Sequence, residues 1–354
     1  MNKLSDKLQQ HLMQGTVIPA HPLALNEDRS LDEYHQRLLT RYYIAAGAGG
    51  IAVAVHSTQF EIRDPEVNLF EKVLQLASEE VERANLTRSF IKICGICGPT
   101  EQAVSEASIA VKHGYDMGLL SMGGLKDWTE ERILDRVRQV AAVIPVFGFY
   151  LQPSVGGRVF SYDFWTKFVE IDNVAAIKCA SFNRYQTLDV MRALANSSRK
   201  HDIAMYTGND DNIVNDLLST YRFPTSEGIT EIGFKGGLLG HWAVWTYEAV
   251  KLLTRVKAYK EKPDAGLANE LLSHAIAVTD SNAALFDPSH DFHGCISGIN
   301  EVLRRQGLMQ GIWCISEGES LSPGQREEID RIYREYPNLN DDDFVRAFLS
   351  ENTN

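Results

Sequence analysis

Eight short apolar segments, each followed by a segment with helical character, alternate along the first two thirds of the chain. Apolar and β-branched residues occupy both alternating positions of these segments, which is typical of strands buried on both faces. The segments are Gly15–Ala20, Gly50–Val55, Ser89–Cys94, Met117–Met122, Pro145–Leu151, Val174–Ala180, Ile203–Thr207 and Ile229–Phe234. This alternation predicts an α/β fold, a parallel (β/α)8 TIM barrel. A doubly wound sheet is the alternative, but no G-x-G-x-x-G motif follows the first segment.

The intervening segments carry helix start signals, and the rest of the chain is helical in pattern. A capping box at Ser30–Glu33 precedes one predicted helix, and Asp64-Pro65 precedes the next. Four further helices are predicted at Trp242–Tyr259, Asp264–Leu285, Phe292–Gln306 and Gln325–Tyr336. We therefore expect a barrel with a short N-terminal helix over residues 1–240, and a C-terminal helical extension packed on it over residues 241–354.

The charge balance and the cysteine count exclude several classes of function. The chain has 35 Lys and Arg against 47 Asp and Glu, a net charge of -12, which argues against nucleic acid or an anionic membrane as a partner. No apolar stretch approaches the ~18 residues of a membrane span, and the N-terminus does not resemble a signal peptide. Five cysteines do not make a disulfide framework, so we expect a cytoplasmic protein.

Two clusters have the residue types of metal or redox sites. Cys94 and Cys97 form C-G-I-C, but no second C-x-x-C accompanies them, so packing is favoured over zinc or redox chemistry. His290, Asp291, His293 and Cys295 lie close together in sequence, where a polar helix start is the more common meaning. We expect no metal site.

One lysine stands inside a strand that is otherwise apolar. Strand alternation in Val174–Ala180 places Ala176, Lys178 and Ala180 on one face. A lysine buried there is costly unless it is paired or neutral, and burial would supply the free amine that imine chemistry needs. The alternative is a lysine at the strand's end that reaches solvent or an ion pair.

Other polar residues follow the ends of predicted strands, where barrel enzymes carry their chemistry. Tyr150, at the end of the fifth strand, could point inward and shuttle protons, although such a tyrosine often only packs. Ser57 and Thr58 follow the second strand and could hold a carboxylate. Thr207–Asp211, which contains Gly208, either lines the pocket or caps the next helix.

Taken together, these segments resemble the dihydrodipicolinate synthase / N-acetylneuraminate lyase family, class I aldolases on a (β/α)8 barrel with a C-terminal helical extension. FGFYLQPSVGG resembles the family's Y-N-x-P-x-x-x-G segment, and VAAIKCAS resembles its Schiff-base segment, G-x-K-x-x. Tyr150 and Lys178 are 28 residues apart, which is the family's spacing. YTGNDD is similar to its S-G-D-D stretch, and the opening strand and C-terminal helices also match in order.

The chain also departs from the family pattern. Where the family has G-T-T-G-E, this sequence has His56–Phe60, which keeps two hydroxyls but neither glycine nor the glutamate. The stretch Met122–Leu125 lacks the tyrosine that synthases lend across a subunit interface, and Val155 replaces their arginine.

The resemblance implies a Schiff-base lyase or aldolase acting on pyruvate or a related 2-oxo acid, together with an aldehyde. It implies Lys178 as the nucleophile, Tyr150 as the proton relay, and Ser57, Thr58 and Gly208 as substrate-binding residues. It also implies a homo-oligomer, a dimer or tetramer, that needs no cofactor. The alternatives are a true 4-hydroxy-tetrahydrodipicolinate synthase and an inactive barrel that binds a 2-oxo acid.

Overall fold

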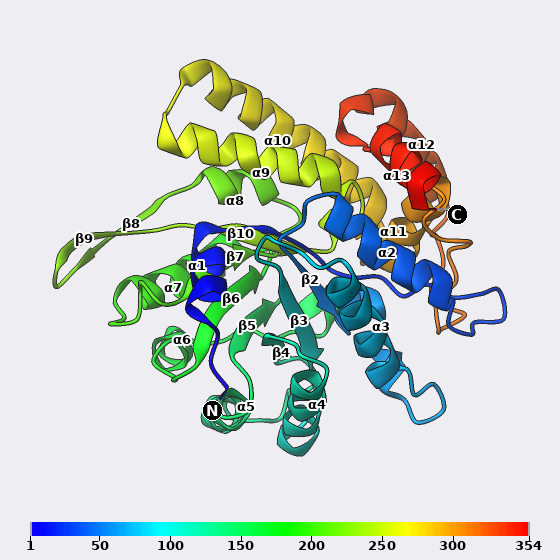
Figure 1. Cartoon of the computed structure of the whole chain (residues 1–354). Coiled ribbons are helices and arrows are strands. Elements are labelled where there is room, and N and C mark those ends of the chain that lie inside the picture. The colour runs from blue at the N-terminus through cyan, green and yellow to red at the C-terminus, as the bar shows by residue number, and fades with distance from the viewer. Residues whose placement is uncertain (1, 353–354) are drawn as a thin grey trace. The chain divides into compact units, whose positions relative to one another are not determined.

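The computed structural model describes residues 2–352 and has the predicted (β/α)8 architecture with C-terminal helices (Figure 1). Eight parallel strands form one sheet in the order β1-β10-β7-β6-β5-β4-β3-β2, and β1 pairs with β2 through Ala20 and Ala52. The strands are β1 (Val17–Pro19), β2 (Gly50–Val53), β3 (Ile91–Ile96), β4 (Met117–Ser121), β5 (Val146–Leu151), β6 (Val174–Ala180), β7 (Ala204–Thr207) and β10 (Gly236–Leu239). The predicted fold class is therefore confirmed.

The chain divides into two compact units, of which the first comprises Met1–Thr16 and Ile91–Leu238. This unit holds β3 to β7, and Figure 1 shows helices along the outer side of these strands. Its helices are α1 (Asp6–Gln14), α4 (Thr100–Lys112), α5 (Glu130–Ala141), α6 (Tyr162–Phe168), α7 (Arg184–Ala195) and α8 (Ile213–Leu218). Each of β3 to β7 is buried along nearly its whole length, as the apolar runs predict.

The N-terminal helix α1 is anchored to the strands of the first unit through Tyr206. The Tyr206 hydroxyl donates to the Leu12 carbonyl at 2.9 Å and accepts from the Thr16 amide at 3.2 Å. Its ring meets Phe147 edge to face, with centroids 5.4 Å apart. Tyr206 is the register partner of Lys178. The side chains of Tyr206 and Lys178 therefore lie on the same face of the sheet.

The second unit comprises Val17–Phe90 and Leu239–Asn354. Its helices are α2 (Glu33–Ala45), α3 (Phe70–Arg83), α9 (Thr246–Glu261), α10 (Ala265–Phe286), α11 (Cys295–Arg305), α12 (Gln325–Glu335) and α13 (Asp342–Asn352). Four of the last five helices match the predicted ones, and α13 was not predicted. Figure 1 shows α9 and α10 lying side by side. The predicted domain boundary at residue 240 stays a prediction.

The predicted eighth strand is wrong. Residues 229–234 lie largely in β9 (Gly228–Ile232), which pairs antiparallel with β8 (Tyr221–Thr225) in a separate, mostly exposed hairpin. The barrel strand is instead β10, whose Gly-Gly-Leu-Leu sequence has no strand-like pattern. Glycine is required at Gly236, because a Cβ there would overlap the Thr16 carbonyl oxygen and lie 2.9 Å from the Tyr206 ring.

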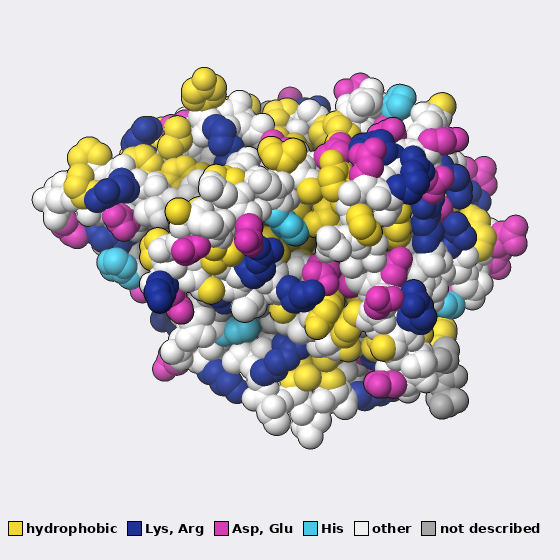
Figure 2. All heavy atoms as spheres, turned by 90° about the horizontal axis from the view of Figure 1, so that it is seen from above, with side chains coloured by type: hydrophobic (Ala, Val, Ile, Leu, Met, Phe, Trp, Pro, Cys, Tyr) yellow, Lys and Arg dark blue, Asp and Glu magenta, His cyan; other side chains and the backbone are white. Residues whose placement is uncertain are grey.

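The surface carries charges of both signs. On the face shown in Figure 2, Lys and Arg side chains are interspersed with Asp and Glu. Many charged side chains of the protein form ion pairs, as Arg331 does with Asp280 at 2.8 Å and with Glu335 at 2.8 Å. Among the described residues, no helix has the length and apolar character needed to cross a bilayer.

Candidate functional site

Lys178 lies near the C-terminal end of β6, and its side chain is buried. All seven residues of this strand are buried, and Lys178 itself is only 8% exposed. The register pairs Lys178 with Phe149 of β5 on one side and with Tyr206 of β7 on the other. The structure therefore confirms a lysine embedded in a central strand, rather than one that reaches solvent from the strand's end.

The surroundings of Lys178 combine a small residue, an aromatic ring and a carboxylate. A Cβ at Gly208 would overlap Lys178 Cε and approach Ala180 Cβ to 2.9 Å, so only glycine leaves room for the lysine chain. Lys178 Nζ lies 4.4 Å from the centroid of the Phe149 ring, which favours the charged amine. Asp210, also buried, acts on Lys178 with its negative charge. The structure thus brings Gly208 and Lys178 together, and the role of Gly208 in binding substrate stays a prediction.

Burial lowers the pKa of Lys178 from its ordinary value of 10.5 to about 8, while the Asp210 charge acts in the opposite direction. Taking water away from the ammonium group penalises the charged form, and one carboxylate does not fully compensate. At pH 8 about half of the amine would be free, against roughly 0.3% for an ordinary lysine. Lys178 is therefore equipped to act as a nucleophile near neutral pH.

Tyr150 faces away from Lys178, so the expectation that it points into the barrel is wrong. Its register partner is Cys179, the residue after the lysine, so the two side chains leave opposite faces of the sheet. The Tyr150 ring packs 4.9 Å from Trp165 of α6, centroid to centroid. Its hydroxyl accepts a long hydrogen bond, 3.5 Å, from the Phe160 amide. Burial raises the pKa of Tyr150 to about 12, so the phenol stays protonated at neutral pH and gives up its proton less readily than an ordinary tyrosine.

A β-bulge explains why Tyr150 and Lys178 do not share a face. At the start of the two strands Val146 pairs with Val174, a separation of 28 residues that would bring Tyr150 opposite Lys178. The next pair is Phe147 with Ala176, because β6 contains one extra residue, Ala175. This shift puts Phe149 beside the lysine and turns Tyr150 toward the helices.

Ser57 and Thr58 lie in a short 3-10 segment, His56–Thr58, of the second unit. The Ser57 hydroxyl donates to the Ala20 carbonyl at 3.0 Å, and the Thr58 hydroxyl donates to the His21 carbonyl at 2.6 Å. Both hydroxyl protons are therefore engaged in joining this segment to the end of β1. The role of the two residues in holding a carboxylate stays a prediction.

The Cys94–Cys97 pair and the His290–Cys295 cluster lie at the end of a strand and at the start of a helix, respectively. Cys94 lies within β3 and Cys97 directly follows the strand, so two extended residues separate them and the three steps span about 10 Å, which is too far for a disulfide. The His290 ring pairs with Asp287, Nδ1 to Oδ1 2.6 Å, just before α11 begins at Cys295. Within residues 2–352, no three His, Cys, Asp or Glu side chains are grouped as metal ligands.

Two residues of the site were not singled out in the sequence. Asp210 follows β7 within the T-G-N-D-D stretch. Because two acids are adjacent there, the sequence does not indicate which of them acts on the lysine. Asp216, in α8, is fully buried and bonds to Thr207 at the end of β7, to Asn209 just after it and to Arg184 at the start of α7. A carboxylate inside the apolar run Ile213–Leu218 is the signal that marks it.

No known protein-family profile matches the chain, and no curated protein sequence matches it. Solved structures do match. Dihydrodipicolinate synthase from Oceanobacillus iheyensis is 15% identical, with a TM-score of 0.74 over 93% of this chain and 99% of its own. N-acetylneuraminate lyase from Fusobacterium nucleatum complexed with pyruvate is 16% identical, with a TM-score of 0.71 over 93% and 99%. CdNal from Clostridium difficile in complex with mannosamine is 16% identical, with a TM-score of 0.71 over 91% and 99%.

This chain has the fold of those enzymes. At 15–17% identity the similarity concerns the arrangement of the elements over nearly the whole chain. It confirms the part of the predicted resemblance that concerns architecture, including the helices that follow the barrel.

The titration of Lys178 can be measured directly by competitive labelling of amines with trace acetic anhydride, followed by peptide mass spectrometry. We expect half-maximal labelling of Lys178 near pH 8, because burial favours its free amine. Asp210→Asn should move this midpoint to lower pH, since a negative charge that favours the ammonium form is lost. A midpoint near 10.5 in the wild-type protein would contradict the description of a desolvated amine.

Proposed function

We propose that the protein is a class I lyase or aldolase that forms a Schiff base between Lys178 and a 2-oxo acid. The observation that carries the proposal is a buried lysine whose pKa is lowered to about 8, near the C-terminal end of a barrel strand. Active sites of TIM-barrel enzymes lie at this end of the strands. The proposal also takes support from the shared fold, since one neighbouring structure is an N-acetylneuraminate lyase complexed with pyruvate.

The chemistry begins with the free amine. The Nζ lone pair of Lys178 attacks the carbonyl carbon of the 2-oxo acid, and the resulting carbinolamine loses water to give an iminium. Removal of a proton from the adjacent carbon gives an enamine. Addition of the enamine to an aldehyde forms a carbon–carbon bond, and the reverse of this addition cleaves one. The lysine nitrogen serves as the electron sink throughout, so these steps balance without an oxidant or reductant.

Asp210 is the proposed acceptor of the proton that Lys178 must lose. Its charge acts on the lysine, and it is buried on the loop that follows β7. A carboxylate beside an amine can take up a proton and return it when water leaves the carbinolamine. In this proposal Asp210 takes over the proton transfer that the resemblance assigned to Tyr150, because the phenol lies on the other face of the sheet.

Ser57 and Thr58 remain the proposed carboxylate contacts, and Gly208 forms the wall beside the lysine. The aldehyde partner, the cytoplasmic location and the homo-oligomeric state belong to the same proposal and follow from the family resemblance. The family's synthase activity is not favoured, because Met122–Leu125 contains no tyrosine and Val155 stands where synthases have arginine.

The outward position of Tyr150 favours a second candidate, a barrel that binds a 2-oxo acid without turnover. Such a protein would form the imine at Lys178 but would not exchange protons at the adjacent carbon. Deuterium exchange into the methyl group of pyruvate, followed by NMR in D2O, separates the two candidates without knowledge of the aldehyde. Exchange requires the enamine, and imine formation alone does not produce it.

Incubation with pyruvate and borohydride should give one reduced adduct per chain, mapped by peptide mass spectrometry to Lys178. Hydride converts the imine into a stable secondary amine, so trapping records the covalent step alone. Lys178→Ala should abolish it, and Lys167→Ala, which removes an exposed lysine of the same unit, should leave it unchanged. An adduct at another lysine, or none over a panel of 2-oxo acids, would remove the basis of the proposal.

Tyr150→Phe deletes the phenol oxygen while keeping the ring against Trp165. We expect pyruvate deuterium exchange to stay within about twofold of wild type, because side-chain volume is conserved. A positioned proton carrier would instead be worth about 10² to 10⁴-fold. A loss in that larger range would show that Tyr150 reaches the substrate in the working enzyme, and would restore its predicted role.

A further inference from the structure

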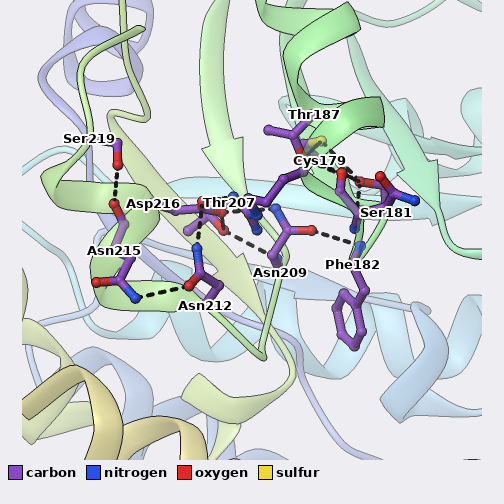
Figure 3. A network of polar contacts seen from close by, with 12 residues as sticks. Cys179, Ser181, Phe182, Thr187, Thr207, Asn209, Asn212, Asn215, Asp216 and Ser219 are labelled. Carbon is purple, nitrogen blue, oxygen red and sulfur yellow. Dashed lines mark hydrogen bonds and ion pairs between the residues drawn. The ribbon is translucent and has the colours of Figure 1, made fainter.

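Asp216 lies at the centre of a buried polar network on the outer face of β6 and β7, opposite the face that carries Lys178. Figure 3 shows the network, which joins α8 to the ends of both strands. The Asp216 carboxylate accepts from the Thr207 hydroxyl at 2.7 Å. It also accepts from the side-chain amides of Asn209 at 2.8 Å and Asn212 at 3.3 Å. It also forms an ion pair with Arg184, the first residue of α7.

The network fixes the backbone of the segment that faces Lys178. Thr207 Oγ1 accepts from the backbone N–H of Asn209 at 3.1 Å. Asp216 and Thr207 therefore hold the residues on both sides of Gly208. The Asn209 side chain also accepts from the Phe182 amide at 3.0 Å, which ties this segment to the loop after β6. Phe182 has a φ of 49°, a left-handed conformation that a bulky residue adopts only when its surroundings impose it.

A fully buried carboxylate is costly unless its partners satisfy it, and its partners here are concentrated in one place. Three of the four donors belong to Thr207–Asn212, and the fourth begins the helix after β6. The network therefore secures this loop segment more than it secures the barrel as a whole. The segment carries Gly208, whose backbone touches Lys178, and Asp210, whose charge acts on it.

We propose that Asp216 is a positioning residue for the lysine site: through Thr207 and Asn209 it fixes the Gly208 backbone against the Lys178 side chain and holds Asp210 beside the lysine amine. The catalytic consequence of this positioning rests on the proposed function, whereas the positioning itself is a property of the protein without substrate. Asp216 itself touches no substrate in this account.

Charged and titratable groups of several elements surround Asp216 and Lys178. Asp216 faces Arg184. Burial, and to a smaller extent the Asp216 charge, raises the pKa of Asp211, of Tyr221 in β8 and of Cys179 in β6. Lys178 is faced by Asp210, by the Phe149 ring and by Tyr206, whose hydroxyl is engaged with α1. Asp216 is not among the groups that shift the pKa of Lys178, so its effect on the lysine must pass through the loop segment.

The test measures the pH midpoint of Lys178 labelling without substrate. Asp216→Asn removes the charge but keeps the shape, and should move the midpoint to lower pH, as Asp210→Asn does, because Asp210 is no longer held beside the amine. Thr207→Val conserves volume and removes one donor, so it should give a smaller shift in the same direction, and it decides the question if Asp216→Asn does not fold. Circular dichroism and thermal unfolding establish that each variant is folded.

Glu301→Gln is the matched control. Glu301 is also fully buried and pairs with Arg304, Arg305 and Arg326, but its contacts lie in the second unit. Its labelling midpoint should equal that of the wild type. An unchanged or raised Lys178 midpoint in folded Asp216→Asn and Thr207→Val would overturn the proposal. An equally lowered midpoint in Glu301→Gln would also overturn it, and so would an unchanged midpoint in Asp210→Asn.

Pyruvate trapping and deuterium exchange then give the catalytic consequence. If the proposed function is correct, exchange in Asp216→Asn should fall by up to about 10²-fold, the cost of misplacing a catalytic group by roughly 1 Å. If wild-type protein shows no trapping at all, the proposed function fails while the labelling midpoints still decide the role of Asp216. The two failures are therefore distinguishable.

Discussion

The burial of the Lys178 amine in strand β6 is the constraint on which the rest of the site depends. A lysine in the middle of a parallel sheet must be neutral, paired or both, because transfer of an ammonium ion out of water is strongly unfavourable. The surroundings of Lys178 supply only partial compensation, from the Phe149 ring and the Asp210 charge. The amine is therefore left more reactive than an ordinary lysine, and the neighbouring residues follow from that: a glycine at 208 makes room for the chain.

The two faces of β5, β6 and β7 divide the work. One face carries Phe149, Lys178 and Tyr206, and the other carries Tyr150, Cys179 and Thr207. On the second face Tyr150 meets the aromatic residues of α6, and Thr207 bonds to Asp216. A strand residue can thus affect the lysine without facing it, because the loops that leave the strand ends are fixed from behind.

Much of this architecture could be predicted from the sequence, and the failures have identifiable physical causes. Seven of the eight barrel strands follow from buried apolar runs, whereas β10 does not, since Gly236 is dictated by close contact with Thr16 and not by apolar periodicity. The position of Lys178 follows from alternation within one strand. The orientation of Tyr150 relative to it depends on the register between two strands, and a single extra residue, Ala175, reverses that orientation without leaving a sequence signal. Asp210 and Asp216 act through contacts between segments that are distant from the strand pattern, which periodicity does not describe.

The most direct test of the central claim is a crystal structure of the protein soaked with pyruvate. We expect continuous electron density from Lys178 Nζ to the second carbon of pyruvate, with Gly208 and Asp210 beside the adduct and the Tyr150 phenol still packed against Trp165. Pyruvate bound without a covalent link, bound away from Lys178, or covalently attached with the Tyr150 hydroxyl turned toward it would contradict the account.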